Sequence, residues 1–380
     1  MTTNRDVYNA AVDLVDGNLE RGRADRTAFV DPSRSLSFGE LAAATRRMVG
    51  LLRAAGVRRE ERVAMLMQDT VDFPVVFWGC LRAGVVPVAL NTLLGAEQYA
   101  YILDDCRAHA LFIQAPLLEG LREVLDRRPH LQEVFVVGGD AGPYHDFGRR
   151  LSGAEALDGP PDTERDEPGF WLYSSGSTGS PKGVLHRQGS LRDTADTYGR
   201  EVLGIEAEDV VFSAAKLFFA YGLGNGMTFP LSVGATTVLH PGRPTPEAVF
   251  EVLSKHAPTL FFGVPTLYSA MLAAGAGESG RTSPRLRRCV SAGEALPREI
   301  GLQWRERVGV DILDGVGSTE MLHIFLSNRP EDVEPGTSGR AVPGYDLRLV
   351  DESGVEVEEE SVGELLVRGQ SSALGYWNLR

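Results

Sequence analysis

Residues 173–183, which read YSSGSTGSPKG, gather three glycines, five small hydroxyl side chains and one lysine. Glycine lets a backbone turn sharply and approach a ligand closely. Hydroxyl groups and a lysine ammonium supply hydrogen-bond donors and a mobile positive charge. This combination suits a polyphosphate. The alternative is a flexible Gly/Ser linker, but a linker seldom stands between a Trp-Leu-Tyr strand and a second apolar run, and rarely contains Pro-Lys-Gly.

The same segment differs from the Walker A loop of P-loop nucleotidases, which has the pattern GxxxxGK[ST] and opens a helix. Here Pro181 precedes Lys182 and Gly183 follows it, so no serine or threonine stands where the magnesium ligand belongs. A P-loop NTPase is therefore excluded. Lysine is also scarce, because only Lys182, Lys216 and Lys255 are found among 38 basic residues. A lysine kept in such a chain suggests a place where arginine fits badly, although three lysines could also persist by chance.

Three later segments of the chain also combine glycine with polar side chains. Residues 291–296 read SAGEAL and follow a predicted strand, residues 315–320 read GVGSTE, and residues 363–365 read GEL. Together with residues 173–183, and in this order, they resemble the motifs of the adenylate-forming superfamily. That superfamily comprises acyl- and aryl-CoA ligases, firefly luciferase and the adenylation domains of nonribosomal peptide synthesis. The resemblance covers essentially the whole chain.

The resemblance implies ATP, Mg²⁺ and coenzyme A as reactants or cofactors. A carboxylate attacks the α-phosphorus of ATP and pyrophosphate leaves with Mg²⁺, so charge neutralisation and positioning dominate the barrier. Glu320 is then expected to ligate Mg²⁺, which prefers hard oxygen ligands. Thr319 and Ser318 are expected to donate to the α-phosphate, and Lys182 to hold the β- and γ-phosphates. Without the family context, Glu320 is better explained as a carboxylate that stabilises a helix N-terminus.

Three sets of site residues follow from the resemblance. The expected catalytic residues are Thr319, Glu320 and Lys182, with Glu320 as the metal ligand. The expected ATP-binding residues are Ser174, Ser175, Gly176, Ser177, Thr178, Gly179, Lys182, Gly293, Glu294, Ala295, Asp314, Gly315, Val316, Gly317, Ser318 and Thr319. The expected substrate-binding residues are Phe219, Ala220, Tyr221, Gly222, Ala292, Gly317, His323 and Ile324.

The expected acid pocket is aromatic and rich in glycine. Residues 216–225 read KLFFAYGLGN and residues 318–328 read STEMLHIFLSN, and both closely resemble benzoate–CoA ligases. No acidic residue occurs between Lys216 and Pro230, so no carboxylate is available there for the ammonium group of an amino acid. His323 could bond a ring hydroxyl, or could be satisfied within the first turns of a helix. Benzoate, hydroxybenzoates and aminobenzoates therefore all stay open as substrates.

Two departures from the family pattern affect these expectations. Val316 stands where the family often has tyrosine, so the adenine would lose an aromatic platform. The Tyr-Arg-Thr-Gly-Asp motif, and the mobile C-terminal domain with its catalytic lysine, do not occur within the 380 residues. We therefore expect the full-length enzyme to make aryl-AMP and then the coenzyme A thioester, and this fragment alone to be poorly active. The alternatives are a stand-alone domain that loads an aryl acid onto a carrier protein, and a non-catalytic acyl-adenylate-binding fragment.

The elements that must position these residues alternate between strands and helices. Ser37 with Glu40 predicts a capping box that opens a helix ending at Gly56. Strands are predicted at 62–67, 85–90, 110–113, 134–137, 170–173, 210–212, 236–239, 259–262, 288–291 and 310–313. Helices are predicted at 70–83, 96–106, 117–128, 190–202, 246–256, 265–274 and 297–307. Such alternation predicts βαβ units and parallel sheets covered on both faces.

The predicted fold class is α/β, with two doubly wound subdomains and a small antiparallel β subdomain, as in the large N-terminal domain of the adenylate-forming fold. An acidic, proline-rich segment at 158–168 predicts an exposed linker. The first subdomain is therefore placed at 1–165, and the second, with the phosphate loop and acid pocket, at 166–334. Short antiparallel strands at 346–350 and 363–367 place the β subdomain at 335–380.

Composition limits the class of partner. A net charge of −14 argues against nonspecific nucleic-acid binding, which depends on lysine and arginine contacts to phosphates. Cys80, Cys106 and Cys289 are widely spaced, so a disulfide framework or zinc site is not expected. The N-terminus is acidic and lacks the apolar region of a signal peptide, and the apolar run at 75–81 is too short to span a membrane. A cytoplasmic enzyme is expected, and a homodimer is left open.

Overall fold

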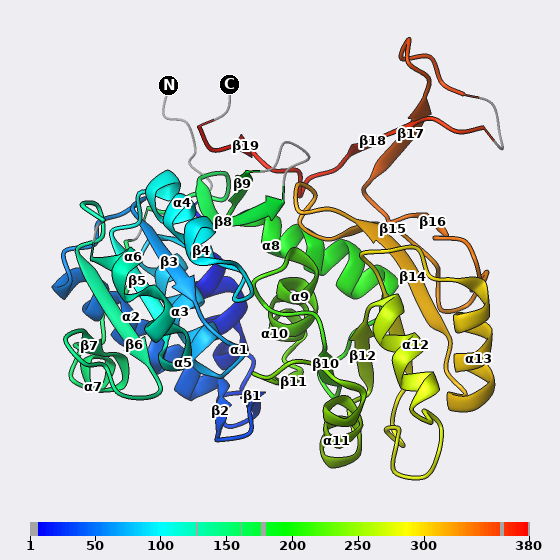
Figure 1. Ribbon diagram of the computed structural model, residues 1–380, viewed down its shortest axis with the longest axis horizontal. Helices are drawn as coiled ribbons and strands as arrows, with labels where there is room; N and C mark the ends of the chain where they lie inside the picture. Colours follow the sequence, from blue (N-terminus) through cyan, green and yellow to red (C-terminus); the bar gives the residue numbers. More distant parts are fainter. Residues whose placement is uncertain (1–6, 127, 161, 176–179, 358–360, 379–380) are drawn as a thin grey trace.

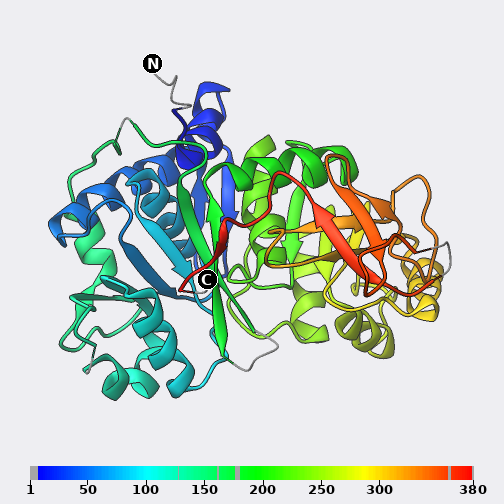
Figure 2. The same ribbon diagram turned by 90° about the horizontal axis from the view of Figure 1, so that it is seen from above.

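Two sheets, each flanked by helices, lie side by side in the computed structural model (Figures 1 and 2). The structure describes residues 7–126, 128–160, 162–175, 180–357 and 361–378. A separate two-stranded sheet projects away from this body. The predicted fold class is therefore confirmed. In the described part of the chain, no helix is both long and apolar enough to cross a membrane.

The first sheet has eight strands in the order β19-β9-β8-β4-β3-β5-β6-β7. Its strands are β3 (Arg62–Leu66), β4 (Val86–Ala89), β5 (Ala110–Gln114), β6 (Glu133–Val137), β7 (His145–Asp146), β8 (Pro168–Ser175), β9 (Pro181–Arg187) and β19 (Gly375–Tyr376). The helices around it are η1 (Val12–Asp16), α1 (Gly17–Glu20), α2 (Phe38–Ala54), α3 (Asp72–Arg82), α4 (Ala96–Cys106), α5 (Ala115–Leu118), η2 (Glu119–Leu121), α6 (Arg122–Leu125) and α7 (Phe147–Ser152).

Period-two alternation of side chains explains why this sheet carries helices on both faces. Val63 and Met65 of β3 join one hydrophobic core with α2 and α3, while Ala64 and Leu66 join another with α4. The expected capping box begins α2, because the Ser37 hydroxyl accepts from the Glu40 amide while the Glu40 carboxylate accepts from the Ser37 amide.

The second sheet has nine strands in the order β16-β15-β14-β13-β12-β10-β11-β1-β2. Its strands are β1 (Thr27–Val30), β2 (Ser35–Ser37), β10 (Val210–Ser213), β11 (Thr236–Val238), β12 (Leu260–Gly263), β13 (Arg288–Ser291), β14 (Ile312–Gly317), β15 (Ile324–Ser327) and β16 (Arg340–Ala341). The associated helices are α8 (Gly189–Thr194), η3 (Ala195–Val202), α9 (Ala220–Leu223), η4 (Gly224–Thr228), α10 (Phe229–Val233), α11 (Pro246–His256), α12 (Pro265–Ala273) and α13 (Arg298–Val308). The projecting pair, β17 (Asp346–Val350) and β18 (Glu364–Arg368), is antiparallel as expected.

Sheet membership departs from the predicted domain boundaries. Strands β1 and β2, from the first 165 residues, complete the second sheet, whereas β8 and β9 belong to the first. The predicted linker at 158–168 is also tied down, because Arg59 forms ion pairs with Asp162 and Glu167. An apolar run in the sequence predicts a strand but does not say which strand pairs with it. The sequence therefore could not predict that β1 and β2 join the second sheet and that β8 and β9 join the first.

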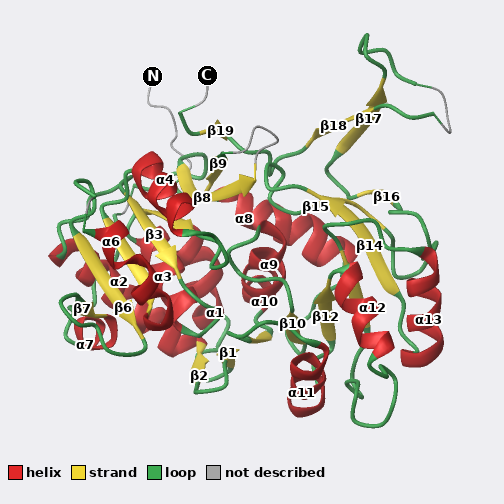
Figure 3. Cartoon of the chain, in the orientation of Figure 1, coloured by secondary structure: helices red, strands yellow, loops and turns green. Residues whose placement is uncertain are grey.

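Each sheet with its helices forms one lobe of the molecule. Strands β8 and β9 lie at the boundary between the two lobes and run through the centre of the molecule in Figure 2. Figure 3 shows the strands of the sheets in yellow with the helices around them in red. The strand ends at Ser174 and Lys182 therefore lie at this boundary.

Candidate active site

The serine-rich segment joins two antiparallel strands. Ser174 of β8 pairs with Lys182 of β9, and Ser175 pairs with Pro181. The segment therefore leads into a strand and not into a helix, which agrees with the exclusion of a Walker A loop. Four of the expected ATP-binding residues, Gly176, Ser177, Thr178 and Gly179, lie outside the described residues.

A tight turn carries the second group of expected residues. It connects β14 to the antiparallel strand β15, with Gly315 opposite Ser327. Within it the Met321 amide donates to the Ser318 hydroxyl at 3.1 Å, and the Leu322 amide donates to the Thr319 carbonyl at 3.1 Å. The helix assumed by the alternative explanations of Glu320 and His323 does not form, because the chain must reverse within a few residues to pair β15 with β14. Glu320 is therefore not a helix N-terminal carboxylate.

Three contacts bring the turn and the lysine strand together. His186 of β9 donates from Nε2 to the carbonyl oxygen of Thr319 at 2.9 Å. The Tyr376 hydroxyl donates to Oε1 of Glu320 at 3.0 Å. The ammonium of Lys182 lies 5.5 Å from the centre of the Tyr376 ring. The lysine and the carboxylate, 138 residues apart in sequence numbering, therefore flank one aromatic ring.

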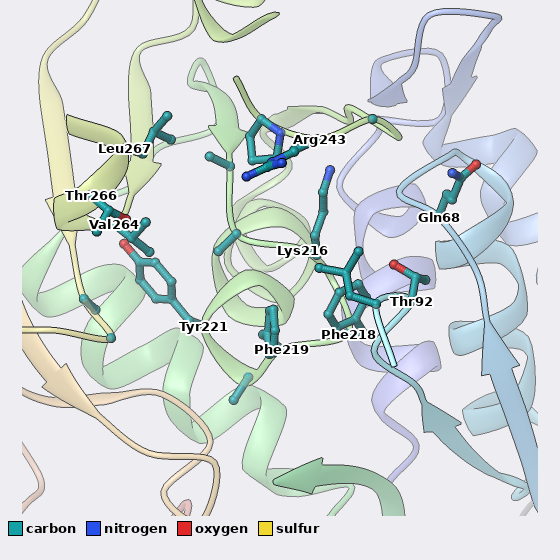
Figure 4. A pocket seen from close by; sticks show the side chains of 18 of the residues that line it. Gln68, Thr92, Lys216, Phe218, Phe219, Tyr221, Arg243, Val264, Thr266 and Leu267 are labelled. Atoms are coloured by element: carbon teal, nitrogen blue, oxygen red, sulfur yellow. The ribbon is translucent and has the colours of Figure 1, made fainter. Parts of the chain in front are cut away.

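A cavity of about 1020 Å³ opens beside this turn. Ten of the expected site residues line it: Phe219, Ala220, Tyr221, Ala292, Gly293, Gly317, Ser318, Thr319, His323 and Ile324. In Figure 4, Tyr221 lies with Val264 and Thr266 at one end, and Gln68 and Thr92 lie at the other. The turn thus borders a space that is much larger than a single benzene ring.

Other expected residues do not line the cavity. Gly222 is buried, and a Cβ there would stand 2.0 Å from the Lys216 carbonyl oxygen, so its place in the fold is explained by close backbone packing. The buried Asp314 accepts from the Ser338 hydroxyl at 3.1 Å, and burial raises the pKa of this carboxyl to about 6. Gly315 is buried against Ile324. Glu294, Ala295 and Val316 are exposed.

The aromatic end of the cavity turns its polar atoms into the protein. The Tyr221 hydroxyl donates to the carbonyl oxygens of Gly263 and Val290 at 3.3 and 3.2 Å. Nε2 of His323 lies 3.0 Å from Oδ1 of Asn225 and acts as the donor, because an amide oxygen can only accept. Burial lowers the pKa of His323 to about 3, so its ring is neutral at physiological pH. The two rings lie 5.6 Å apart and present mainly carbon to the cavity.

Sequence reasoning missed a buried ion pair at the other end. Lys216 lines the cavity, donates to the His240 carbonyl, and lies 3.8 Å from the Asp69 carboxylate. Asp69 comes from the first lobe and accepts from the Leu217 amide of the second at 3.2 Å. Burial raises the pKa of Asp69 to about 6, although Lys216 opposes the shift. The scarcity of lysine was the one signal for this position.

The Ser318 and Thr319 residues of the turn line one side of a carbon-lined cavity, whereas Glu320 and Lys182 lie outside the lining, on either side of Tyr376. Such an arrangement can hold an apolar acid with its carboxylate toward a phosphate group. Glu320 offers a hard oxygen of the kind that Mg²⁺ prefers. In the described ranges, no group of three or more His, Cys, Asp or Glu side chains could hold a metal ion. One protein carboxylate, completed by phosphate oxygens and water, fits Mg²⁺ and its habit of being shared with substrate phosphates.

Known proteins share this arrangement of the chain. The family model described as AMP-binding enzyme matches residues 17–377. A 4-hydroxybenzoate–CoA/benzoate–CoA ligase of Rhodopseudomonas palustris is 52% identical over 373 residues, which are 98% of this chain and 69% of that protein. A benzoate–CoA ligase of Thauera aromatica is 51% identical, over 98% of this chain and 70% of its own. A solved benzoate CoA ligase from Burkholderia xenovorans LB400 has a TM-score of 0.92 at 46% identity, covering 98% of this chain and 74% of its own.

Proposed function

Because the chain belongs to the AMP-binding enzyme family, we propose that it activates benzoate with ATP, releasing pyrophosphate, and passes the acyl group to coenzyme A. Two relatives about half identical to it are ligases that act on benzoate, one of them also on 4-hydroxybenzoate. The observation that carries the proposal is the meeting of Lys182 and Glu320 around Tyr376, at the edge of a cavity lined by Tyr221 and His323.

The proposed first step needs no general base. The benzoate carboxylate is already ionised at neutral pH, so its oxygen can attack the α-phosphorus directly while the bond to the pyrophosphate oxygen breaks. His323 is neutral and hydrogen-bonded inside the wall, which agrees with a positioning role and not with proton transfer. The barrier comes from bringing two anions together, so donors and cations near the reacting atoms supply most of the rate enhancement.

Roles for the polar residues follow from their placement. The Ser318 and Thr319 hydroxyls border the cavity and are proposed to donate to the α-phosphate. Lys182 is proposed to neutralise the β- and γ-phosphates. Glu320 is proposed to hold Mg²⁺ together with phosphate oxygens of ATP. When bound, the ion stabilises the negative charge that develops on the leaving pyrophosphate.

The carbon-lined end of the cavity favours an unsubstituted ring. A ring hydroxyl buried there would lose its bonds to water, and the Tyr221 hydroxyl and His323 Nε2 are already committed to wall acceptors. An unsatisfied hydroxyl costs about 1–3 kcal/mol, which corresponds to roughly 5- to 150-fold in kcat/KM. We therefore propose that benzoate is used better than 4-hydroxybenzoate. Equal use of both acids would mean that another lining hydroxyl, such as that of Thr266, satisfies the ring substituent.

The second step needs room for a thiol. Benzoate occupies only part of a cavity of about 1020 Å³, and the remainder extends toward Gln68, Thr92 and Lys216. We propose that the coenzyme A thiol approaches the acyl carbon through this remainder. The thiol sulfur then bonds to the carbonyl carbon and AMP leaves.

The sequence also led us to expect a cytoplasmic location and left a homodimer open. Both remain proposals.

The decisive experiment separates activation from transfer. Purified protein is incubated with Mg·ATP, benzoate and coenzyme A, and benzoyl-AMP and benzoyl-CoA are separated by chromatography and identified by mass. Parallel reactions contain acetate or phenylalanine in place of benzoate, or a phosphopantetheinyl carrier protein in place of coenzyme A. We expect benzoyl-AMP with benzoate alone, and thioester on coenzyme A, both formed slowly when only these 380 residues are present. Absence of benzoyl-AMP, or preferential loading of the carrier, would overturn the respective half of the proposal.

A further inference from the structure

Tyr376 lies between the two charged groups of the candidate site although no motif points to it. It belongs to β19, which pairs antiparallel with β9, so that Gly375 lies opposite Leu185 and Tyr376 opposite Val184. The next amide, of Trp377, donates to the Gly183 carbonyl at 2.8 Å. The ladder fixes Tyr376 beside the strand that carries Lys182.

The two ends of the tyrosine side chain contact different partners. Its hydroxyl lies 3.0 Å from Oε1 of Glu320 and must be the donor, because an ionised carboxylate can only accept. Its ring lies 5.5 Å from the Lys182 ammonium, within the range of a cation–π contact. Among the ion pairs of the described residues, none joins Lys182 directly to Glu320, so the tyrosine is interposed between them.

The segment that carries Tyr376 also holds the backbone of the turn. The Ala373 amide donates to the Glu320 carbonyl at 2.7 Å, and the Ser371 hydroxyl donates to the Met321 carbonyl at 2.7 Å. Ser371 is in turn 2.7 Å from the hydroxyl of the buried Tyr345. Residues 371–376 therefore form a clamp, because the same segment fixes both the backbone and the side chain of Glu320.

We infer that Tyr376 is a positioning residue for the reaction, which orients the Glu320 carboxylate with its hydroxyl and keeps Lys182 apart from that carboxylate with its ring. The inference rests on the proposed function, which gives Glu320 to Mg²⁺ and Lys182 to the phosphates. Lys182 and Glu320 are half-buried while the Tyr376 side chain is exposed, and opposite charges within reach of each other attract. If they paired directly, each would occupy the other before the nucleotide arrived. The tyrosine leaves one carboxylate oxygen and the ammonium free to face the ligand.

Two substitutions separate the two parts of this role. Tyr376→Phe removes only the hydroxyl and leaves the ring between the charges. Tyr376→Leu removes both the donor and the aromatic face. Tyr144→Phe is the matched control, because it removes a tyrosine hydroxyl from the same chain at a position outside the cavity lining, near Arg122 and Asp126. Circular dichroism melting of all four proteins shows whether each variant is folded.

The main readout is metal binding, not turnover. Binding of Mn²⁺ in the presence of ATP is followed by electron paramagnetic resonance, with Mn²⁺ as a probe for the Mg²⁺ site. We expect Tyr376→Phe to raise the Mn²⁺ dissociation constant by roughly tenfold, as for loss of a hydrogen bond to a charged group, with little change in ATP affinity measured without metal. We expect Tyr376→Leu to weaken metal-free ATP binding as well, because Lys182 is then drawn to Glu320.

The outcomes distinguish the inference from the proposed function. Wild-type protein that binds neither ATP nor metal, and makes no benzoyl-AMP, contradicts the proposed function itself. If the wild type binds both and folded Tyr376→Phe binds Mn²⁺ as tightly as wild type does, the positioning role of the hydroxyl is wrong. If Tyr376→Leu binds metal-free ATP as well as Tyr376→Phe does, the spacer role of the ring is wrong. A loss in Tyr144→Phe equal to that in Tyr376→Phe would show a general effect of tyrosine removal and overturn both roles.

Discussion

The Thr319 carbonyl accepts a hydrogen bond of 2.9 Å from Nε2 of His186, so the strand after the serine-rich segment is joined directly to the turn that carries Glu320. A carbonyl can only accept, which fixes the proton on Nε2. Burial lowers the pKa of His186 to about 4, so the imidazole is neutral and keeps this tautomer at physiological pH. The turn is thus held on one side by β9 and on the other by residues 371–376.

Replacing His186 by leucine should release the turn from β9. We expect the KM for ATP to rise by roughly tenfold, as for one lost buried hydrogen bond, with a smaller change in the KM for benzoate. Pyrophosphate exchange measured at varied ATP and varied benzoate gives both constants. His186→Asn retains a side-chain donor and should recover part of the loss. Equal effects on both substrates in a folded variant would argue against a specific link to the phosphate side.

Glu320→Gln tests the metal role. The amide keeps the size of the side chain but removes the negative charge that a hard cation needs. We expect pyrophosphate exchange to fall by roughly 100-fold or more, by analogy with loss of a main electrostatic contributor, and the fall to persist at high Mg²⁺. Glu306→Gln, at an exposed position of α13 outside the cavity lining, is the control for charge removal. Near-normal exchange in Glu320→Gln would falsify the assignment.

Lys182→Ala tests the phosphate role of the lysine. The KM for ATP should increase by roughly tenfold or more, because one charge-assisted contact to a phosphate is lost, while the KM for benzoate changes less. Lys255→Ala, on the exposed end of α11, is the matched control among the three lysines. A larger effect on benzoate than on ATP would place the lysine at the wrong end of the substrate pair.

The sequence predicted those parts of the fold that are encoded locally. The capping box of Ser37 and Glu40 depends on residues three positions apart, and it is present. The strand β13 was predicted with its exact bounds, Arg288–Ser291, because its apolar run is flanked by polar residues. The addition of β1 to the far sheet depends on contacts across about 200 residues, such as Phe29 with Thr237, and no periodicity reports such a pairing.

The same division holds for the candidate site. Lys182 and Glu320 stand in segments whose composition is unusual, so they could be singled out from the sequence. Tyr376 stands in the two-residue strand β19 and His186 in the seven-residue strand β9. Nothing in the sequence around either residue distinguishes an aromatic side chain that only packs from one that positions a site residue. Asp69 lies in an ordinary strand-to-helix connection. Its role depends on Leu217 and Lys216, which only the packing of the two lobes brings near.

The pH dependence of stability should change when Asp69 is replaced by asparagine. The folded-state pKa of Asp69 is raised to about 6, so between about pH 4 and 6 the folded protein binds more protons at this site than the unfolded chain. This contribution therefore makes the folded state less stable as pH rises through the window. His186 and His323, with pKa values lowered to about 4 and about 3, act in the opposite direction, because the unfolded chain takes up their protons below about pH 6.5.

Replacing Asp69 should therefore leave the contribution of the two histidines to the pH dependence of stability unopposed at this site. Between pH 4.5 and 6.5, the free energy of unfolding of Asp69→Asn should rise with pH more steeply than that of wild type, by up to about 2 kcal/mol over the window. Urea unfolding at several pH values measures it. Asp314→Asn should act in the same direction, since burial also raises that pKa to about 6. A shallower slope in Asp69→Asn would contradict the assigned shift.

Filling the aromatic end of the cavity should separate acid binding from nucleotide binding. Ala292 follows β13 and lines the cavity with Gly317 and His323, and its side chain is almost fully buried. Ala292→Leu places three more carbons where the ring is proposed to lie, so the KM for benzoate should rise by roughly tenfold or more through the cost of overpacking. Mn·ATP binding should change far less, because the phosphates are proposed to lie on the other side of the turn. Ala273→Leu, an equal enlargement at an exposed position of α12 outside the cavity, controls for the added volume. If Ala292→Leu lost ATP and benzoate affinity together while its melting temperature matched that of Ala273→Leu, the ring would have to lie elsewhere in the cavity.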